Sequence, residues 1–402
     1  MSRERGGGWR GGGVEGWRVE GGGWRVEGGG VRVEGGGGRG EGGSAEARGI
    51  WMMARQIDVM LATHAGGAHV EAYLAALGAS PDCGRVTLCD PDGTWHEAAR
   101  AKLGERLQRV ERELAPLLAE RPELALVSYE ARLAPGVIEA ALEAGCHVLA
   151  EKPGCVAVAD FARLCQIADS KHRWLMLAFA NRSNPEIVAA RELVRGGRLG
   201  RLYGIELQLV ADQTRLTSEG YRRQWFAQKS RAGGGHLAWL GIHWLDLAMY
   251  VTGSRLVTAT GLTTNIGGTP LDIEDSAVVA FQLENGILGT LTSGYYLPRG
   301  YHSRLQVWGS QGWLRLDPVN ERRLEWLTTV GERAGEVIQE PPAATPGGYT
   351  PFVGAVCRAV ASETEPPVTT AESLRAIEGV FAVYRAAETG TTQRWPGEGA
   401  GR

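Results

Sequence analysis

The sequence predicts two folded domains: an α/β domain with a doubly wound parallel sheet, followed by an α+β domain with a mostly antiparallel open sheet. Between residues 57 and 178, short apolar runs alternate with helical patterns, which is the order that produces a parallel sheet. Beyond residue 200, short apolar runs follow one another with Gly or Asn turns between them, as in antiparallel hairpins. A chain of 402 residues is long enough for two such domains.

The first 52 residues differ in composition from the rest. A repeat of the type Gly-Gly-Gly-Trp-Arg-Val-Glu recurs, with small variations, at residues 21–27 and 28–34. Because glycine dominates and few side chains can be buried, we predict that residues 1–52 form a disordered tail. It is either an interaction arm that uses its tryptophans, or a stretch without a role in catalysis. We place the first folded domain at 53–180 and the second at 181–395.

The composition argues against several classes of partner. The formal net charge is -3 and the basic residues are dispersed, so no surface for nucleic acid is expected. No apolar run approaches the roughly 18 residues of a membrane span, and no signal-peptide pattern is present. The six cysteines form no C-x-x-C pair, which makes a metal site improbable. We expect a soluble cytoplasmic protein without a bound metal.

The first domain opens with an apolar strand at 57–62, a turn and a helix at 68–77. The turn contains Thr63, His64, Gly66 and Gly67. Strand, glycine turn and helix form the opening of a dinucleotide-binding Rossmann unit.

A second strand at 85–90 ends in Asp90, and the carboxylate at this offset suits the adenosine ribose of NAD better than that of NADP. The alternative is that Asp90 only begins the turn Asp90-Pro91-Asp92-Gly93.

Glu151 and Lys152, which directly follow the fourth predicted strand, can be placed in the fold from the sequence alone. The remaining elements of the domain are a helix at 96–118, a strand at 124–128, a helix at 134–144, a strand at 147–150, a helix at 159–169 and a strand at 174–178. Glu151 and Lys152 directly follow one of these strands. They therefore lie at the carboxyl edge of the sheet, where parallel sheets bind their ligands.

The second domain begins with a helix at 185–195. Its predicted strands lie at 202–209, 255–263, 275–283, 286–295, 303–309 and 313–316, and helices at 351–361 and 371–388 end the fold. The broad face of such a sheet could pair subunits, so we expect a homo-oligomer.

Several motifs together resemble the Gfo/Idh/MocA family, over roughly residues 55 to 395. The supporting stretches are Ala141-Leu142-Glu143-Ala144-Gly145 followed by His147-Val148-Leu149-Ala150-Glu151-Lys152-Pro153, Asn181-Arg182 with Asn184-Pro185, Gly233-Gly234-Gly235, Gly241-Ile242-His243, and Glu274-Asp275-Ser276-Ala277. A lone Glu-Lys-Pro would be weak evidence, but its place between these blocks makes the resemblance specific.

The resemblance implies reversible hydride transfer between NAD, or alternatively NADP, and a carbinol carbon of a sugar, sugar derivative or cyclitol. It implies that Lys152 hydrogen-bonds the reacting oxygen and that His243 is the acid/base. Either residue could instead be structural, Lys152 at the surface and His243 buried and satisfied. The cofactor contacts implied are Thr63, His64, Gly66, Gly67, Asp90, Glu151, Lys152 and Asn181, and the substrate contacts are Arg182, Tyr221, Trp239 and His243.

Three departures from the family's usual pattern stand close to these residues. His64 takes a position where glycine lets the backbone approach pyrophosphate. Tyr129-Glu130 replaces a Thr-Pro-Asn loop, and we expect the Glu130 side chain to point to solvent. Trp239 replaces an aspartate four residues before His243, for which His236 is a speculative substitute. Two alternatives therefore stay open: an NAD-recycling hydrolase or lyase, and a non-catalytic member that has lost the dinucleotide site.

Overall fold

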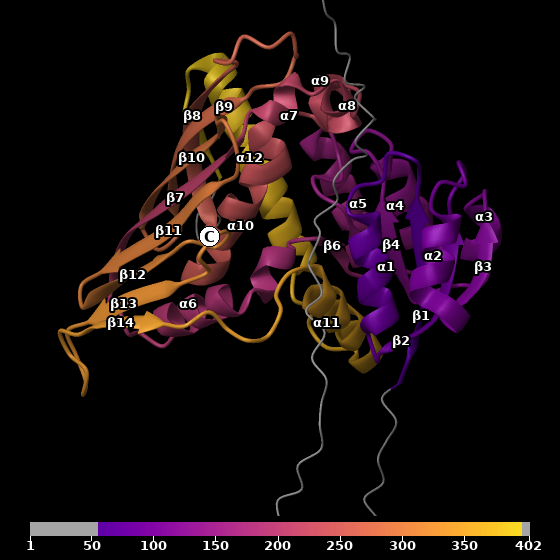
Figure 1. The fold of residues 1–402 in the computed structure, drawn as a ribbon, viewed down its shortest axis with the longest axis horizontal. Helices are drawn as coiled ribbons and strands as arrows, with labels where there is room; N and C mark the ends of the chain where they lie inside the picture. Colours follow the sequence, from indigo (N-terminus) through magenta and orange to yellow (C-terminus); the bar gives the residue numbers. More distant parts are fainter. Residues whose placement is uncertain (1–54, 396–402) are drawn as a thin grey trace, which may run out of the picture. The chain divides into compact units, whose positions relative to one another are not determined.

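The computed structural model describes residues 55–395, so the predicted disordered tail at 1–52 lies outside the described residues. The first sheet has six parallel strands in the order β3-β2-β1-β4-β5-β6 (Figure 1). Its strands are β1 (Ile57–Thr63), β2 (Cys83–Cys89), β3 (Leu107–Glu111), β4 (Leu124–Ser128), β5 (His147–Ala150) and β6 (Leu175–Leu177). Its helices are α1 (Val70–Ala79), α2 (His96–Leu103), α3 (Ala115–Leu118), α4 (Ala134–Glu143) and α5 (Val158–Ser170). The doubly wound parallel sheet is confirmed.

The strand order reverses between β1 and β4, which creates a crevice at their carboxyl ends. Thr63 and Ser128, the last residues of the two strands, are register partners. The Thr63 hydroxyl donates to the Ser128 carbonyl over 3.2 Å and ties the strand ends together. Ligands of such sheets bind at this edge, so the fold itself places the candidate site here.

The single helix predicted at 96–118 is wrong. Helix α2 ends at Leu103, and Gly104 follows with a φ of 54°, a conformation that glycine adopts without strain. A 3-10 turn (Gly104–Arg106), edge strand β3 and α3 occupy the rest of the segment. Three of the five β3 residues are charged or amide-bearing, as is typical of an edge strand, so the sequence carried no apolar run to reveal it.

The second sheet has nine strands in the order β14-β13-β12-β11-β7-β10-β9-β8-β15. All neighbouring pairs are antiparallel except β7 and β10, so the mostly antiparallel sheet is confirmed. The short strands β13, β14 and β15 were not predicted. The bounds are β7 (Leu202–Asp212), β8 (Leu256–Thr264), β9 (Ser276–Leu283), β10 (Leu288–Leu297), β11 (His302–Gly309), β12 (Gly312–Leu316), β13 (Leu324–Thr328), β14 (Val337–Glu340) and β15 (Gln393–Arg394).

Helices cover one face of this sheet and also reach the first domain. Figure 1 shows α6 (Pro185–Arg195), α10 (Ile242–Thr252) and α12 (Thr370–Thr389) along that face. Helix α12 closes the open edge of the first sheet, because Thr370 Oγ1 and Ser373 Oγ each accept a backbone N–H of β6 over 3.0 Å. Helix α11 (Tyr349–Ser362) packs against α1. No helix within residues 55–395 is long and apolar enough to cross a membrane.

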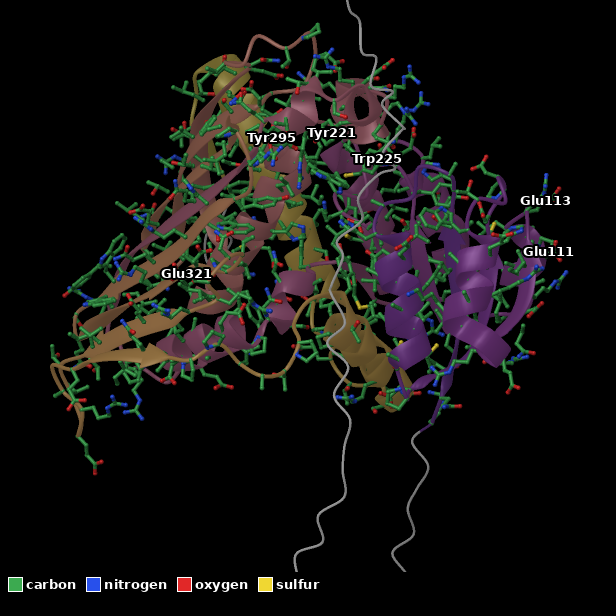
Figure 2. The ribbon with its side chains drawn as sticks, viewed as in Figure 1. Glu111, Glu113, Tyr221, Trp225, Tyr295 and Glu321 are labelled. Atoms are coloured by element: carbon green, nitrogen blue, oxygen red, sulfur yellow. The ribbon has the colours of Figure 1, made fainter. Side chains whose placement is uncertain are left out.

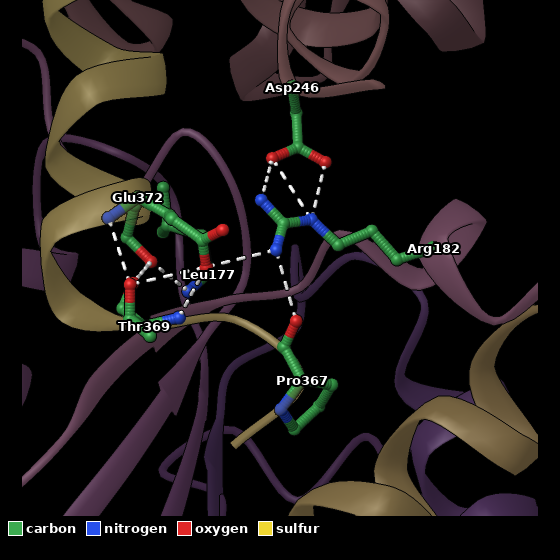
Figure 3. A network of polar contacts seen from close by, with 7 residues as sticks. Leu177, Arg182, Asp246, Pro367, Thr369 and Glu372 are labelled. Atoms are coloured by element: carbon green, nitrogen blue, oxygen red, sulfur yellow. Dashed lines mark hydrogen bonds and ion pairs between the residues drawn. The ribbon is translucent and has the colours of Figure 1, made fainter. Parts of the chain in front are cut away.

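One buried ion-pair network links the segment between the domains to α10 and α12 (Figure 3). Arg182 lies in a 3-10 turn (Ala180–Ser183) and is 3% exposed. Its guanidinium contacts Asp246 at 2.6 Å and Glu372 at 3.0 Å, and donates to the Pro367 carbonyl over 3.0 Å. Burial opposes the charge, but the two carboxylates outweigh it and raise the pKa of Arg182. The charge is therefore retained inside the protein.

Replacing Asp246 with alanine should lower the apparent free energy of unfolding by about 3 to 5 kcal/mol, because Arg182 would stay buried without its main partner. Denaturant unfolding followed by circular dichroism measures this. The matched control is Glu336→Ala, which breaks the exposed pair with Arg333 and should change stability little. Equal effects of the two substitutions would contradict the structural role of the network.

Candidate cofactor and substrate site

The turn after β1 is closed by a glycine that no other residue could replace without displacement. Gly67 N donates to the His64 carbonyl over 2.8 Å. A Cβ at Gly67 would lie 2.1 Å from Thr63 Oγ1 and 3.0 Å from the Ser128 carbonyl. The chain must therefore be glycine here to pass so close to the strand ends, as a phosphate-binding turn requires.

The His64 side chain folds back over this turn. Its Nδ1 lies 3.2 Å from Gly66 N, and its Nε2 lies 3.2 Å from Glu130 N. Burial lowers the pKa of His64, which favours the neutral ring. A neutral imidazole has one acceptor nitrogen, so it satisfies only one of these two N–H groups at a time. The other N–H group finds no acceptor nitrogen in this ring.

The expectation that Glu130 points to solvent is wrong. The Glu130 side chain is buried and pairs with Arg231, whose Nε lies 2.9 Å from the carboxylate. Arg231 belongs to α9 (Lys229–Ala232), one of the short helices inserted after β7. The carboxylate is thus neutralised by the second domain, and it presents no free negative charge to a phosphate.

Asp90 keeps one oxygen available. It is fully buried at the end of β2, and Oδ2 accepts from Trp95 N over 2.7 Å. Oδ1 is also buried and has no hydrogen-bond partner in the described structure. Oδ2 therefore stabilises the turn by its hydrogen bond, and Oδ1 suits a ribose hydroxyl donor. The two hypotheses for Asp90, a turn residue and a cofactor contact, are thus compatible.

The first turn of α1 adds donors to this crevice. Its N-cap residue makes no side-chain capping bond, so the first N–H groups of the helix can bind an anion. Together with the turn at Gly67 and the unpartnered Asp90 oxygen, they fit a dinucleotide.

Glu151 is the centre of the polar contacts beyond the turn. Its side chain is fully buried. Oε2 accepts from the Tyr73 hydroxyl over 2.6 Å and lies 3.0 Å from His69 Nδ1. Oε1 accepts from Lys152 N over 3.1 Å and lies 3.7 Å from Lys152 Nζ. Burial acts to raise the pKa of Glu151, but His69, Lys152 and Tyr73 outweigh it and lower the pKa to about 2.

Lys152 is held against Trp239, so the structure brings these two predicted residues together. The lysine is 1% exposed, and Nζ donates to the Trp239 carbonyl over 2.7 Å. The same nitrogen lies 3.4 Å from the centroid of the Trp239 ring, a cation–π contact. Burial lowers the pKa of Lys152 to about 8, against the opposing charge of Glu151. The amine can therefore exchange a proton near physiological pH.

His243 lies close to this lysine. Its Nδ1 is buried without a hydrogen-bond partner, and its ring packs edge-on against Phe179. Burial and then the charge of Lys152 lower the pKa of His243 to about 3, so the imidazole is neutral near pH 7. A π-helical turn (Leu237–Gly241) that carries Trp239 precedes His243, and such turns are frequent at functional sites.

The remaining predicted residues lie in several places. Asn181 is half-buried in the turn beside Arg182, whose guanidinium is engaged by protein acceptors as described above. Tyr221 in α8 (Glu219–Arg222) contacts the Tyr295 hydroxyl at 2.5 Å, and Figure 2 shows both near Trp225. His236 is fully buried and contacts Ser293 Oγ at 2.7 Å, so its partner is a serine of β10.

Sequence reasoning missed His69, Tyr73 and Tyr349. His69 stacks on Trp239 and on Tyr349, with ring centroids 6.0 and 5.0 Å apart. The only signal for His69 is its place two residues after the glycine turn. Its contact with Glu151 spans 82 positions and is invisible in local patterns.

The fold and this site define a two-domain protein whose first domain is a nucleotide-binding Rossmann domain. Residues 62–179 match the model of an oxidoreductase family with an NAD-binding Rossmann fold, and residues 187–315 match the GFO/IDH/MocA C-terminal domain. The two matches together cover more than half of the chain. The chain belongs to the GFO/IDH/MocA family.

Curated relatives match part of the chain. D-glucoside 3-dehydrogenase of Escherichia coli strain K12 is 32% identical over 168 residues, which are 42% of this chain and 46% of that protein. A dTDP-3,4-didehydro-2,6-dideoxy-alpha-D-glucose 3-reductase of Saccharopolyspora spinosa is 30% identical over 55% of this chain and 64% of that protein. The chain therefore spans about half to two thirds of the length of these relatives.

Among solved structures, levoglucosan dehydrogenase in complex with NADH and levoglucosan superposes with a TM-score of 0.76 at 18% identity. The match covers 85% of this chain and all of that one. At this identity the likeness concerns the fold.

Proposed function

We propose that this protein is an NAD-dependent oxidoreductase that transfers a hydride between the nicotinamide and a carbinol carbon of a sugar, sugar derivative or cyclitol. The observation that carries the proposal is the buried Lys152 amine, which donates to the Trp239 carbonyl and lies 3.7 Å from Glu151 Oε1, together with the buried His243 ring, whose Nδ1 has no hydrogen-bond partner in the described structure. The names of the two curated relatives, a dehydrogenase and a reductase of sugar derivatives, support the substrate class.

In this proposal the first domain, 53–180, binds the cofactor. NAD, when bound, supplies the hydride acceptor. The turn with Thr63, His64, Gly66 and Gly67 and the start of α1 would hold the pyrophosphate, and Asp90 would accept a hydrogen bond from the ribose. A buried carboxylate at Asp90 disfavours the extra phosphate of NADP, so we propose NAD as the cofactor. Glu151 and Asn181 would supply further contacts to the cofactor.

The second domain, 181–395, covers the substrate. The neutral His243 imidazole accepts the hydroxyl proton, and the Lys152 ammonium donates a hydrogen bond to the oxygen as negative charge develops on it. Trp239 and Tyr221 offer an aromatic face and a hydroxyl to the sugar. The guanidinium of Arg182 is engaged by Asp246 and Glu372, so Arg182 stabilises the fold and does not contact the substrate in this proposal.

A second candidate, a non-catalytic member of the family, is favoured by two contacts. His64 covers backbone donors of the turn, and Trp239 covers the Lys152 amine. Such a protein would bind neither NAD nor NADH.

Replacing Lys152 with methionine should lower kcat by roughly a hundredfold to ten-thousandfold, because the developing alkoxide loses its hydrogen-bond donor. NADH formation at 340 nm over a panel of sugars and cyclitols measures this, with NAD affinity and thermal stability measured alongside. Lys171→Met, at an exposed pair with Glu143, is the control and should turn over like the unchanged protein. Unchanged turnover in Lys152→Met would contradict the proposed role of Lys152.

We also propose a cytoplasmic homo-oligomer. All six cysteines are free and buried, which suits a reducing compartment. The uncovered face of the second sheet exposes large apolar side chains, among them Leu262, Val278 and Leu288. Leu262 and Val278 are register partners, so they form one continuous apolar surface that a second copy of the chain could cover.

A double substitution, Leu262→Lys with Val278→Lys, should dissociate the oligomer, because two charges would be desolvated in the interface. Light scattering coupled to gel filtration gives the mass. Val337→Lys, at an exposed position on edge strand β14, is the control and should leave the mass unchanged. A single-chain mass for the unchanged protein would contradict the assembly.

A further inference from the structure

Two basic side chains face the same buried carboxylate. His69 Nδ1 lies 3.0 Å from Glu151 Oε2, and Lys152 Nζ lies 3.7 Å from Glu151 Oε1. The Glu151 side chain has no exposed surface and that of Lys152 is 1% exposed, whereas the His69 side chain is 34% exposed. His69 thus joins the buried pair to solvent.

The backbone fixes His69 in this position. It precedes α1 with a φ of 57°, a left-handed conformation that is uncommon for a residue with a side chain. The ring lies between Trp239 and Tyr349, nearly parallel to the indole with an interplanar angle of 9°. Strained residues of this kind concentrate at functional sites, and here the strain aims an imidazole at Glu151.

We propose that His69 and Lys152 compete for the single negative charge of Glu151, so that His69 controls how tightly Lys152 holds its proton. His69 Nδ1 draws on the carboxylate at the shorter distance, so the Lys152 ammonium is less stabilised than it would be if Glu151 supported it alone. His69 is therefore a positioning residue that acts through Glu151.

The other groups around the carboxylate do not compete in this way. Burial and the charge of Glu151 raise the pKa values of Tyr73 and Tyr349 well above their ordinary range, so both stay neutral. Burial keeps His243 neutral, with a pKa of about 3. The charge of Arg215 also acts on Lys152. His69 and Lys152 remain as the two basic side chains that face the carboxylate.

The functional consequence rests on the proposed dehydrogenase activity, in which Lys152 contacts the reacting oxygen. The contact of His69 with Glu151 would make Lys152 a better proton donor, although Lys152 itself is buried.

The chain suits a direct test, because it contains four lysines, Lys102, Lys152, Lys171 and Lys229. Carbon-13 NMR of protein labelled at the lysine ε-carbon gives the titration midpoint of each, and Lys152→Met assigns the signal. His69→Asn removes the imidazole and tolerates the left-handed backbone. It should raise the Lys152 midpoint by a few tenths of a pH unit to about one unit, because Glu151 loses its nearer basic partner and supports the ammonium alone. Glu151→Gln should lower the midpoint.

The matched control is His172→Asn, since His172 is also left-handed, with a φ of 52°, and is exposed. It should leave the Lys152 midpoint unchanged. If His69→Asn does not fold, His69→Gln replaces it, with the same expected direction. An unchanged or lowered midpoint in the His69 variant would overturn the proposal. The titration needs neither NAD nor substrate, so its outcome is independent of whether the proposed dehydrogenase activity holds.

Discussion

The buried carboxylate of Glu151 is the constraint on which the candidate site depends. A carboxylate fully removed from water is stable only when hydrogen bonds and opposite charges compensate its desolvation. Here Tyr73 and His69 satisfy one oxygen, and Lys152 satisfies the other through its backbone and its amine. Glu151 follows β5 directly, so the sheet fixes its position, and its partners must come to it. The positions of helix α1 and of Lys152 are therefore those that bring partners to the buried carboxylate.

The second domain completes the site by packing onto the first. Trp225 donates its indole N–H to the Gly66 carbonyl over 2.9 Å, and Arg231 neutralises Glu130. Trp239 supplies both a carbonyl and a ring to Lys152. These contacts remove water from the lysine and bring its pKa to about 8. The chemistry of the Glu-Lys pair is therefore a property of both domains, although the pair itself belongs to the first.

Local patterns in the sequence predict what depends on local forces. The buried strands β1, β4 and β5 are apolar runs, and the sequence places them within a residue or two. Strand β3 was not predicted, because an edge strand needs few apolar residues. The predicted orientation of the Glu130 side chain was wrong because its partner, Arg231, lies 101 positions away in the sequence. His69 was missed for the same reason, since only the folded chain brings it to Glu151.

In the proposed oxidoreductase, the turn after β1 binds NAD although His64 lies over it. Titration of the protein with NADH, followed by the fluorescence of the nicotinamide, measures this most directly. We expect saturable binding with one NADH for each chain, and weaker binding of NADPH because of the buried carboxylate at Asp90. Absence of saturable binding by either nucleotide would show that the protein is not an NAD-dependent oxidoreductase and would favour a non-catalytic protein.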